Sequence, residues 1–417
     1  MKDVFVIGTG MTRFAKHLER SEKNLVSEAV NFCLTDAGVS IGAIQSAWFS
    51  NSMWGYFSDQ HCIRGQVALQ PLGIEGIPIT NVENACAGGS TAFHHAWYGV
   101  AGGLYDCVLA VGVEKLYSKD RLKTFRAYST GTDVENIESQ FEAWRNVLDG
   151  LELEVPGDDS GQGAGENRSA FMDVYAGMSR WHMAKYGTTQ RQLAVIASKN
   201  HYHSSMNPNA QFQKIMSVDE ILTGQPVIFP LTVPMCAPVG DGSAAAILCS
   251  GSFLKRLNSS RSVKVLASVL GSGTGRQISE EKKDIAYRLS QQAYEIAGIG
   301  PEDIHLAEVH DATSFGELHQ TEALGFCSFG KGGEFAESGA TTLGGKLPVN
   351  PSGGLESRGH PVGASGLGQI HEIVTQLRHE AGPRQVENCR IGLTENGGGN
   401  IGYEEAAMGI HILERVD

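Results

Sequence analysis

The sequence predicts an α/β fold made of two similar halves, with a loop domain inserted between them. Short apolar runs that end in glycine alternate with helical patterns, which is typical of α/β proteins. Glycine is frequent, at 52 of 417 residues, and gathers in turns after the apolar runs. The order strand, helix, strand, glycine-rich turn, helix and strand occurs twice, which indicates a duplicated unit.

The first half starts with a buried-strand pattern at residues 3–8 and a helical pattern near 27–37. Another strand is expected at 46–50. A short apolar strand then leads into "NACAGGSTAFHHAWYGV", where Cys86 stands between that strand and a helix rich in small residues. A strand at 106–112 closes this part of the chain.

The second half repeats the order. Its predicted elements are a strand at 263–271, a helix near 283–297, a strand in "IHLAEVHDA", a helix that ends at about residue 379, and strands at 390–393 and 406–413. The glycine-rich segment "NPSGGLESRGHPVGASG" precedes the long helix, as "NACAGGS" does in the first half. The duplication therefore places Cys86 and His360 at matching positions, each before a helix of small residues.

Between the halves the periodic pattern loosens, and the segments "AYSTGTDVEN" and "EVPGDDSGQGAGENRS" are typical of loops. Helices are expected here at 141–148 and 171–186, within a domain that covers a site. The predicted segments are 1–116 for the first part of the N-terminal half, 117–187 for the inserted loop domain, 188–255 for the return to the N-terminal half, and 256–417 for the C-terminal half.

Composition excludes some classes of function. The formal net charge of −13 argues against a nucleic-acid-binding protein, which needs a basic face. No run of about 18 apolar residues occurs, so no membrane span is expected, and the N-terminal apolar run is too short for a signal peptide. The eight cysteines are scattered without C-x-x-C pairs, which argues against disulfides and metal binding and favours the cytoplasm.

Cys86 and His360 are the candidate catalytic pair. A thiol at the start of a helix faces free N–H groups and the positive end of the helix dipole, which predicts a lowered pKa and a nucleophilic thiolate. The alternative for Cys86 is a buried structural cysteine, the role that we expect for most of the others. His360 is the best candidate for the base, because neutral imidazole transfers protons near pH 7. Its alternative is a loop or capping histidine.

Four segments together resemble the motif set of thiolases: "NACAGGS", "GDGSAAA", "HDATSFGEL" and "NPSGGLESRGHPVGASG". The sequence is most similar to the sterol-carrier-protein branch, also called lipid-transfer-protein-like thiolases. In that branch a His-Asp motif replaces an asparagine motif, as "HDA" does here at 310–312. The resemblance covers nearly the whole chain. It implies the thiolase fold, in which two similar α/β halves form αβαβα layers, and an acyltransferase activity.

The resemblance also implies a role for each site residue. Cys86 would carry the acyl group as a thioester, and His360 would activate Cys86 and help to form the first oxyanion hole. His310 would stand in that hole, where the family holds a catalytic water. The backbone N–H groups of Cys86 and of a glycine near Gly397 would form the second hole. Hydrogen-bond donors of this kind are needed because a negative charge develops on the thioester oxygen during the reaction.

One departure from the family concerns its second catalytic cysteine, which moves a proton at the substrate α-carbon or on the incoming CoA. In "GLTENGGGNIG", Glu395 stands where that cysteine would be, and Cys389 lies before the last buried strand. Glu395 could replace the cysteine if burial raised the pKa of its carboxyl. The alternative is a solvated turn residue.

The favoured function is a degradative β-ketothiolase, which cleaves a β-ketoacyl-CoA with CoA through a Cys86 thioester. Aromatic residues of the inserted region, among them Phe141, Trp144 and Trp181, favour a bulky aromatic or branched acyl chain, as in aromatic degradation or lipid metabolism. The alternatives are a biosynthetic acetoacetyl-CoA thiolase, a thiolase-fold retro-aldolase of side-chain degradation, and a non-catalytic lipid-binding protein. The retro-aldolases do not use the nucleophilic cysteine, so Cys86 counts against them.

The resemblance implies coenzyme A as co-substrate and no metal on this chain. Family members dimerise around the segment that corresponds to "PITNVEN" before Cys86, so we expect a homodimer or a dimer of dimers. Prokaryotic relatives often pair with a small protein that carries an OB fold and a zinc ribbon. If this protein has such a partner, any zinc belongs to the partner.

Overall fold

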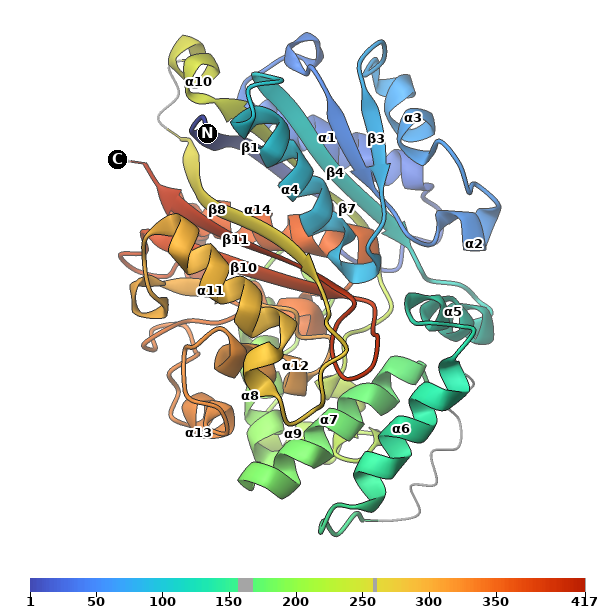
Figure 1. The fold of residues 1–417 in the computed structure, drawn as a ribbon. Coiled ribbons are helices and arrows are strands. Elements are labelled where there is room, and N and C mark those ends of the chain that lie inside the picture. The colour runs from blue at the N-terminus through green and yellow to red at the C-terminus, as the bar shows by residue number, and fades with distance from the viewer. Residues whose placement is uncertain (157–167, 258–260, 417) are drawn as a thin grey trace.

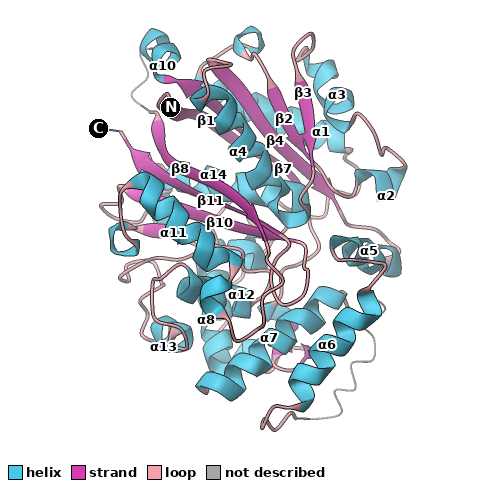
Figure 2. Ribbon diagram, viewed as in Figure 1, coloured by secondary structure: helices cyan, strands magenta, loops and turns pink. Residues whose placement is uncertain are grey.

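The computed structural model describes residues 1–156, 168–257 and 261–416 (Figure 1). A mixed sheet of nine strands, in the order β3-β2-β4-β7-β1-β8-β11-β10-β9, runs through the molecule (Figure 2). Its strands are β1 Val4–Met11, β2 Ala47–Ser50, β3 Ile79–Val82, β4 Cys107–Lys115, β7 Asp241–Ser250, β8 Val263–Ser272, β9 Leu306–Glu308, β10 Ile391–Gly398 and β11 Ala407–Arg415. Two short strands, β5 Pro226–Ile228 and β6 Leu231–Thr232, pair separately.

The sheet is built from two halves with the same pairing pattern. In the first half, β2 is parallel to β4, and the antiparallel strands β7 and β1 follow. In the second half, β9 is parallel to β10, and the antiparallel strands β11 and β8 follow. The halves meet where β1 pairs with β8, through Phe5 with Lys264 and Val6 with Val263. The repeated pattern confirms the predicted duplication.

Helices complete five layers. Helices α4 (Gly88–Ala101) and α14 (Ser365–Leu377) contact each other and strands of both halves, so they form the central layer (Figure 1). Helix α1 (Glu22–Ala37) packs on β1, β4 and β7, and α11 (Ile285–Ala297) packs on β8 and β11. This αβαβα arrangement confirms the fold class that the sequence predicts.

Local signals in the sequence fix the ends of α1. The hydroxyl of Ser21 accepts a hydrogen bond from the backbone N–H of Asn24, and the Asn24 side chain accepts one from the Ser21 N–H. Gly38 ends the helix in the left-handed region with φ 65°. The apolar face of α1 then lies on the first half-sheet, with Leu25 and Val26 fully buried.

The N-termini of the two central helices approach each other at glycines. A Cβ atom at Gly366 would lie 2.5 Å from Ser90 Oγ and 2.6 Å from the Ser90 backbone nitrogen. A Cβ at Gly89 would lie 3.0 Å from the backbone nitrogen of Leu367. Because a larger residue would hold the helices apart, these glycines let the turns that carry Cys86 and His360 meet.

The segment between β4 and β7 forms a helical layer at one end of the molecule (Figure 1). Its helices are α5 Arg121–Tyr128, α6 Ile137–Asp149, α7 Ala170–Tyr186, α8 Gln190–Ser205 and α9 Val218–Leu222. The helices expected at 141–148 and 171–186 lie within α6 and α7, whereas α5 was not expected. Most of the loop segment "EVPGDDSGQGAGENRS" lies outside the described residues.

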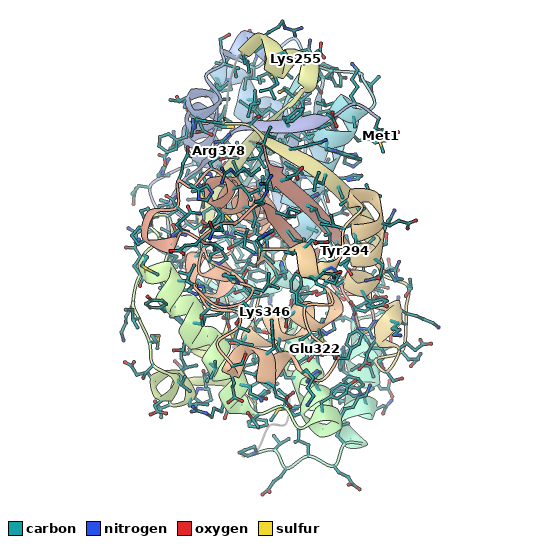
Figure 3. All side chains as sticks on the ribbon, turned by 90° about the vertical axis from the view of Figure 1, so that its left-hand side faces the viewer. Met1, Lys255, Tyr294, Glu322, Lys346 and Arg378 are labelled. Carbon is teal, nitrogen blue, oxygen red and sulfur yellow. The ribbon has the colours of Figure 1, made fainter. Side chains whose placement is uncertain are left out.

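The remaining helices are α2 Trp54–Ser58, α3 Arg64–Leu69, α10 Gly251–Leu257, α12 Ser314–Ala323 and α13 Gly332–Glu337. Side chains fill the space between the layers, from Lys255 on α10 at one end to Glu322 on α12 toward the other (Figure 3). Among the residues that the structure describes, no helix is both long and apolar enough to cross a membrane.

Candidate active site

Cys86 lies on a tight turn between β3 and α4. A single 3-10 turn, Ala85–Ala87, connects directly to the first residue of the helix, Gly88. Ala85 has φ 47°, in the left-handed region that alanine rarely adopts, so the surrounding structure must hold this turn in shape. The turn is what presents the Cys86 thiol beside the start of α14.

His360 lies on the matching turn of the second half, just before the 3-10 turn Val362–Ala364 and α14. Its Nε2 lies 3.2 Å from Cys86 Sγ, and its Nδ1 lies 2.7 Å from Ser365 Oγ. Ser365 Oγ donates its own hydrogen to the carbonyl of Pro361 at 3.0 Å. Ser365 must therefore accept from Nδ1–H, which leaves Nε2 free to accept the thiol proton.

His310 follows β9 and faces the same point. Its ring centroid lies 5.2 Å from that of His360, in an edge-to-face arrangement. Its Nδ1 lies 3.1 Å from the amide nitrogen of Asn396, a donor, so the hydrogen of the neutral His310 ring is on Nε2. His310 can therefore donate a hydrogen bond where a substrate oxygen would become negative.

The Cys86 sulfur and one nitrogen from each of these two histidines lie within 4.8 Å of one another. Within the described ranges, these residues are the one cluster whose spacing could also hold a metal ion. A metal bound there would occupy the nucleophile and its base at once, so this cluster cannot serve both purposes simultaneously. The expectation that this chain carries no metal stays a prediction.

The electrostatics of the thiol differ from the sequence-based expectation. Burial, followed by the negative charge of Glu114, raises the pKa of Cys86 to about 12, although a backbone hydrogen bond from Gly399 lowers it. Cys86 lines a cavity, and the effect of burial on the pKa of its thiol exceeds that of the helix start. Burial lowers the pKa of His310 to about 4 and that of His360 well below its usual value. The resting pair is thus a neutral thiol beside a neutral imidazole.

The glycine that faces Cys86 is Gly399, two residues beyond the Gly397 expected from the sequence. The hydrogen bond to the Cys86 thiol comes from the Gly399 backbone. Gly397 pairs with Met408 in the sheet, and a Cβ there would lie 2.8 Å from Glu405 Cγ. The end of β10 lies against the Cys86 turn, since a Cβ at Gly398 would lie 2.9 Å from the Cys86 backbone nitrogen, and Gly399 follows directly.

A cavity of about 510 Å³ opens onto this group. Its floor includes Cys86, His310 and His360, and its wall carries aromatic residues from the inserted region and from the following loop: Phe125, Tyr128, Phe171, Tyr175 and Phe212. The aromatic residues singled out from the sequence do not line this cavity. Trp144 packs against Tyr403 with a centroid distance of 4.9 Å, and Trp181 packs against Tyr186 at 6.2 Å.

Glu395 is fully buried on β10, so it is not a solvated turn residue. Its Oε2 accepts a hydrogen bond of 2.8 Å from the backbone N–H of His310. Burial and the nearby charge of Glu405 raise the pKa of the Glu395 carboxyl well above its usual value. Glu395 is not among the residues that line the cavity, and its carboxyl contacts His310 through the His310 backbone N–H.

Sequence reasoning missed Glu405, the carboxyl that does line the cavity. It lies in "GYEEAAMG", just before β11, and no motif marks it. The one available signal was a pair of acidic residues in a short turn directly after the glycine-rich "GGGNIG". Such a pair is usually solvated, whereas here only 8% of Glu405 is exposed.

Three further histidines, His94, His201 and His203, have structural partners. His203 Nδ1 lies 2.9 Å from the Asn350 carbonyl, and His203 Nε2 accepts from the Leu343 N–H. His201 lies 3.1 Å from Ser357 Oγ. His94 lies 3.0 Å from Ser268 Oγ. None of these residues is among those that line the cavity.

Comparisons with known families agree with this architecture. Residues 4–225 match the model of the thiolase N-terminal domain, and residues 274–414 match the model of the thiolase C-terminal domain-like family. The chain therefore belongs to the thiolase family, a family of acyltransferases. This confirms the resemblance seen in the sequence motifs.

Individual relatives lie in the expected branch. The chain is 37% identical to the acetyl-CoA acetyltransferase of Methanothermobacter thermautotrophicus, over 100% of both chains. It is 38% identical to sterol carrier protein 2 of Homo sapiens, over 100% of this chain and 75% of the relative. It is 33% identical to benzoylsuccinyl-CoA thiolase subunit BbsB of Thauera aromatica, over 95% of each chain.

Solved structures share the fold. An Ltp2–ChsH2(DUF35) aldolase matches with a TM-score of 0.76 and 22% identity, over 99% of this chain and 98% of that chain. Human mitochondrial 3-ketoacyl-CoA thiolase in complex with CoA matches with a TM-score of 0.69 and 15% identity, over 100% of this chain and 98% of the other. At these identities the likeness establishes the fold alone.

Proposed function

We propose that this acyltransferase is a degradative β-ketothiolase that cleaves a bulky β-ketoacyl-CoA with CoA. The observation that carries the proposal is the Cys86 thiol, 3.2 Å from His360 Nε2, in a cavity of about 510 Å³ that aromatic residues line. A non-catalytic lipid-binding protein has no need for a thiol, a base and an oxyanion donor that converge on one point.

In the first step His360 accepts the proton of Cys86 as the sulfur attacks the β-keto carbon of the substrate. A thiol with a pKa of about 12 is almost wholly protonated in isolation, so the neighbouring base is essential. The same burial that suppresses the free thiolate makes the thiolate, once formed, a strong nucleophile. The Ser365 hydroxyl holds the imidazole in the orientation that this transfer needs.

In the second step the bond between the α-carbon and the β-carbon breaks, which leaves an acyl group on Cys86 and an enolate on the departing acyl-CoA. We propose that His310 Nε2–H and the protonated His360 stabilise the enolate oxygen. The backbone N–H groups of Cys86 and Gly399 would stabilise the oxygen on the carbon that Cys86 attacks. Glu395 positions His310 through the backbone hydrogen bond of 2.8 Å.

An aromatic or branched acyl chain is the substrate class that the cavity supports best. Aromatic rings prefer edge-to-face and stacked contacts with other rings, which the five aromatic wall residues can supply. The relationship to benzoylsuccinyl-CoA thiolase subunit BbsB, whose name records an aromatic acyl group, points the same way.

A second candidate is the formation of acetoacetyl-CoA from acetyl-CoA. The relationship to an acetyl-CoA acetyltransferase over the full length of both chains favours it. The two candidates use the same Cys86 chemistry and differ in the size of the acyl group that they accept.

Mass spectrometry of the intact protein after incubation with a panel of acyl-CoAs tests the proposal. Acetyl-, branched-chain and benzoyl-CoA form the panel, and peptide mapping locates the acyl group. We expect acylation at Cys86, fastest with the bulky thioesters, and none in Cys86→Ala. A protein that takes up only acetyl groups would favour acetoacetyl-CoA synthesis, and one that takes up none at Cys86 is not a thiolase.

We further propose that the protein works as at least a homodimer. Strand β3 includes most of "PITNVEN". Among the residues that the structure describes, β3 pairs with β2 alone and forms one edge of the sheet. An unpaired edge strand can continue a sheet into a second subunit. Light scattering at micromolar concentration should give at least twice the chain mass of 44.6 kDa.

We also propose that the protein binds a small partner that carries an OB fold and a zinc ribbon. Copurification from the native host would test this proposal.

A further inference from the structure

The thiolase chemistry needs a proton donor for the departing α-carbon, and Glu395 does not line the cavity. Among the described residues, the cysteines that line it are Cys86 and Cys236. Burial, followed by the charge of Glu356, raises the pKa of Cys236 well above its usual value. Its Sγ already donates toward the Thr232 carbonyl at 3.5 Å.

We propose that Glu405 is the acid that protonates the substrate α-carbon and the base that later deprotonates CoA. The inference rests on the proposed thiolase function and deepens it. Glu405 lines the same cavity as Cys86, His310 and His360. Its side chain is more than nine-tenths buried, and within the described part of the chain its Oε2 has no hydrogen-bond partner. A buried carboxyl oxygen without a partner is costly unless a ligand completes it or a proton neutralises it.

The backbone places Glu405 close to the Gly399 turn, which faces the nucleophile. The neighbouring residue, Ala406, donates its N–H to the carbonyl of Gly399 at 3.4 Å, and Gly399 is the residue whose backbone faces the Cys86 thiol. Glu405, Gly399 and Tyr175 also line a second, smaller cavity that adjoins the first. The carboxyl therefore lies between the Gly399 turn and helix α7, on the wall of the substrate cavity.

The opposite oxygen of Glu405 is anchored. Its Oε1 accepts from Gln320 Nε2 at 3.3 Å, and Oε2 is the oxygen left without a partner among the described residues. Burial and the charge of Asp284 raise the pKa of Glu405, whereas His319 and Arg276 lower it. Asp284 itself lies 3.2 Å from His319 Nε2 and forms an ion pair of 2.5 Å with Arg276. A carboxyl with a raised pKa can start as the acid and return as the base.

Every proton that is transferred in one turnover has a donor and an acceptor. His360 takes the Cys86 proton, Cys86 attacks, and cleavage of the carbon–carbon bond passes its electron pair to the α-carbon. The Glu405 carboxyl gives its proton to that carbon and becomes a carboxylate. The carboxylate then takes the thiol proton of CoA, and the CoA sulfur attacks the thioester. Cys86 leaves as a thiolate and recovers its proton from His360.

The test compares Glu405→Gln with Glu395→Gln and with Glu295→Gln, which makes the same change on the exposed face of α11. Three readouts are measured: acylation of Cys86 by a simple acyl-CoA, cleavage of a β-ketoacyl-CoA, and deuterium uptake from D₂O into the α-position of acyl-CoA. Acylation needs no carbanion, whereas the other two readouts need proton transfer at carbon. Acylation is measured near pH 8.5, where the CoA thiolate can leave without an acid.

We expect Glu405→Gln to acylate Cys86 at a rate within about threefold of wild type but to lose cleavage and deuterium uptake by about 10²–10⁴-fold, the usual contribution of a general acid. Glu395→Gln should keep deuterium uptake within about tenfold, because it retains the hydrogen bond to His310, and Glu295→Gln should match wild type. Glu405→Asp keeps an acid of similar strength at a shifted position, so it should exchange deuterium faster than Glu405→Gln. If Glu405→Gln does not fold, the rate of deuterium uptake in Glu405→Asp tests the proposed role of Glu405 instead.

Deuterium uptake at the wild-type rate in Glu405→Gln would overturn the assignment. Failure of the proposed function gives a different result, because wild-type Cys86 would then not be acylated at all.

Discussion

The reactivity of Cys86 should depend almost entirely on His360. With a pKa of about 12, an unassisted Cys86 would be about 10⁻⁴ thiolate at pH 8, compared with about a quarter for an ordinary thiol of pKa about 8.5. Removal of the base by His360→Ala should therefore make alkylation of Cys86 by iodoacetamide about 10²–10³-fold slower than in the wild-type protein.

The pH dependence gives the sharper test. In the wild type, the thiol proton moves to His360 without exchange with water, so the alkylation rate should be flat across neutral pH. In His360→Ala, the rate should follow the free thiolate and rise about tenfold per pH unit up to pH 10, because the pKa of about 12 lies above that range.

The assay is peptide-level mass spectrometry after short exposures to iodoacetamide. Cys62 is exposed and serves as an internal reference in the same sample. His310→Ala is the matched histidine variant and should leave the ratio of Cys86 to Cys62 alkylation nearly unchanged, because His310 does not contact the thiol in the way that His360 does. Equal Cys86 to Cys62 ratios and equal pH slopes in wild type and His360→Ala would refute the pairing.

Three further outcomes are expected. Cys86→Ser should abolish thiolysis while circular dichroism and the unfolding midpoint stay unchanged, because a serine hydroxyl is a far weaker nucleophile of nearly the same shape; full activity would remove Cys86 from the mechanism. His310→Ala should lower kcat for cleavage by about 10²–10³-fold with little change in Cys86 alkylation, since one oxyanion donor is lost, and an unchanged kcat would exclude that role. Gly366→Ala should lower the free energy of unfolding in urea by about 1–3 kcal/mol, because its Cβ would lie 2.6 Å from the Ser90 backbone nitrogen. Gly42→Ala should not, because its Cβ would make an ordinary contact of 3.9 Å with Ser40 Oγ; equal stabilities would contradict the tight approach of α4 and α14.

The sequence by itself determined the architecture and the position of the reactive pair. The duplicated order of elements depends on hydrophobic periodicity and glycine turns, which are local signals. Cys86 and His360 could be found because each stands at the same kind of turn before a helix of small residues. Two such turns in a duplicated fold face each other, and the structure brings the two side chains to 3.2 Å.

Only the tertiary structure decided how the site is charged and shaped. The helix start predicted a lowered pKa for Cys86, but burial and Glu114, a residue on β4, raise it. Trp144 packs on Tyr403 and Trp181 packs on Tyr186, while other aromatic residues from α5, α7 and the loop at Phe212 line the cavity.

The carboxyl groups of Glu395 and Glu405 also show which features the sequence determines and which the tertiary structure determines. Sequence position marked Glu395, where the family has its second cysteine, but the direction of its side chain on β10 turns it toward the His310 backbone. Glu405 carries no motif and reaches the cavity because the turn after Gly399 folds back against α7. Local sequence fixes which backbone turns form, whereas desolvation and the neighbours of a charged group depend on segments hundreds of residues apart that meet only when the layers pack.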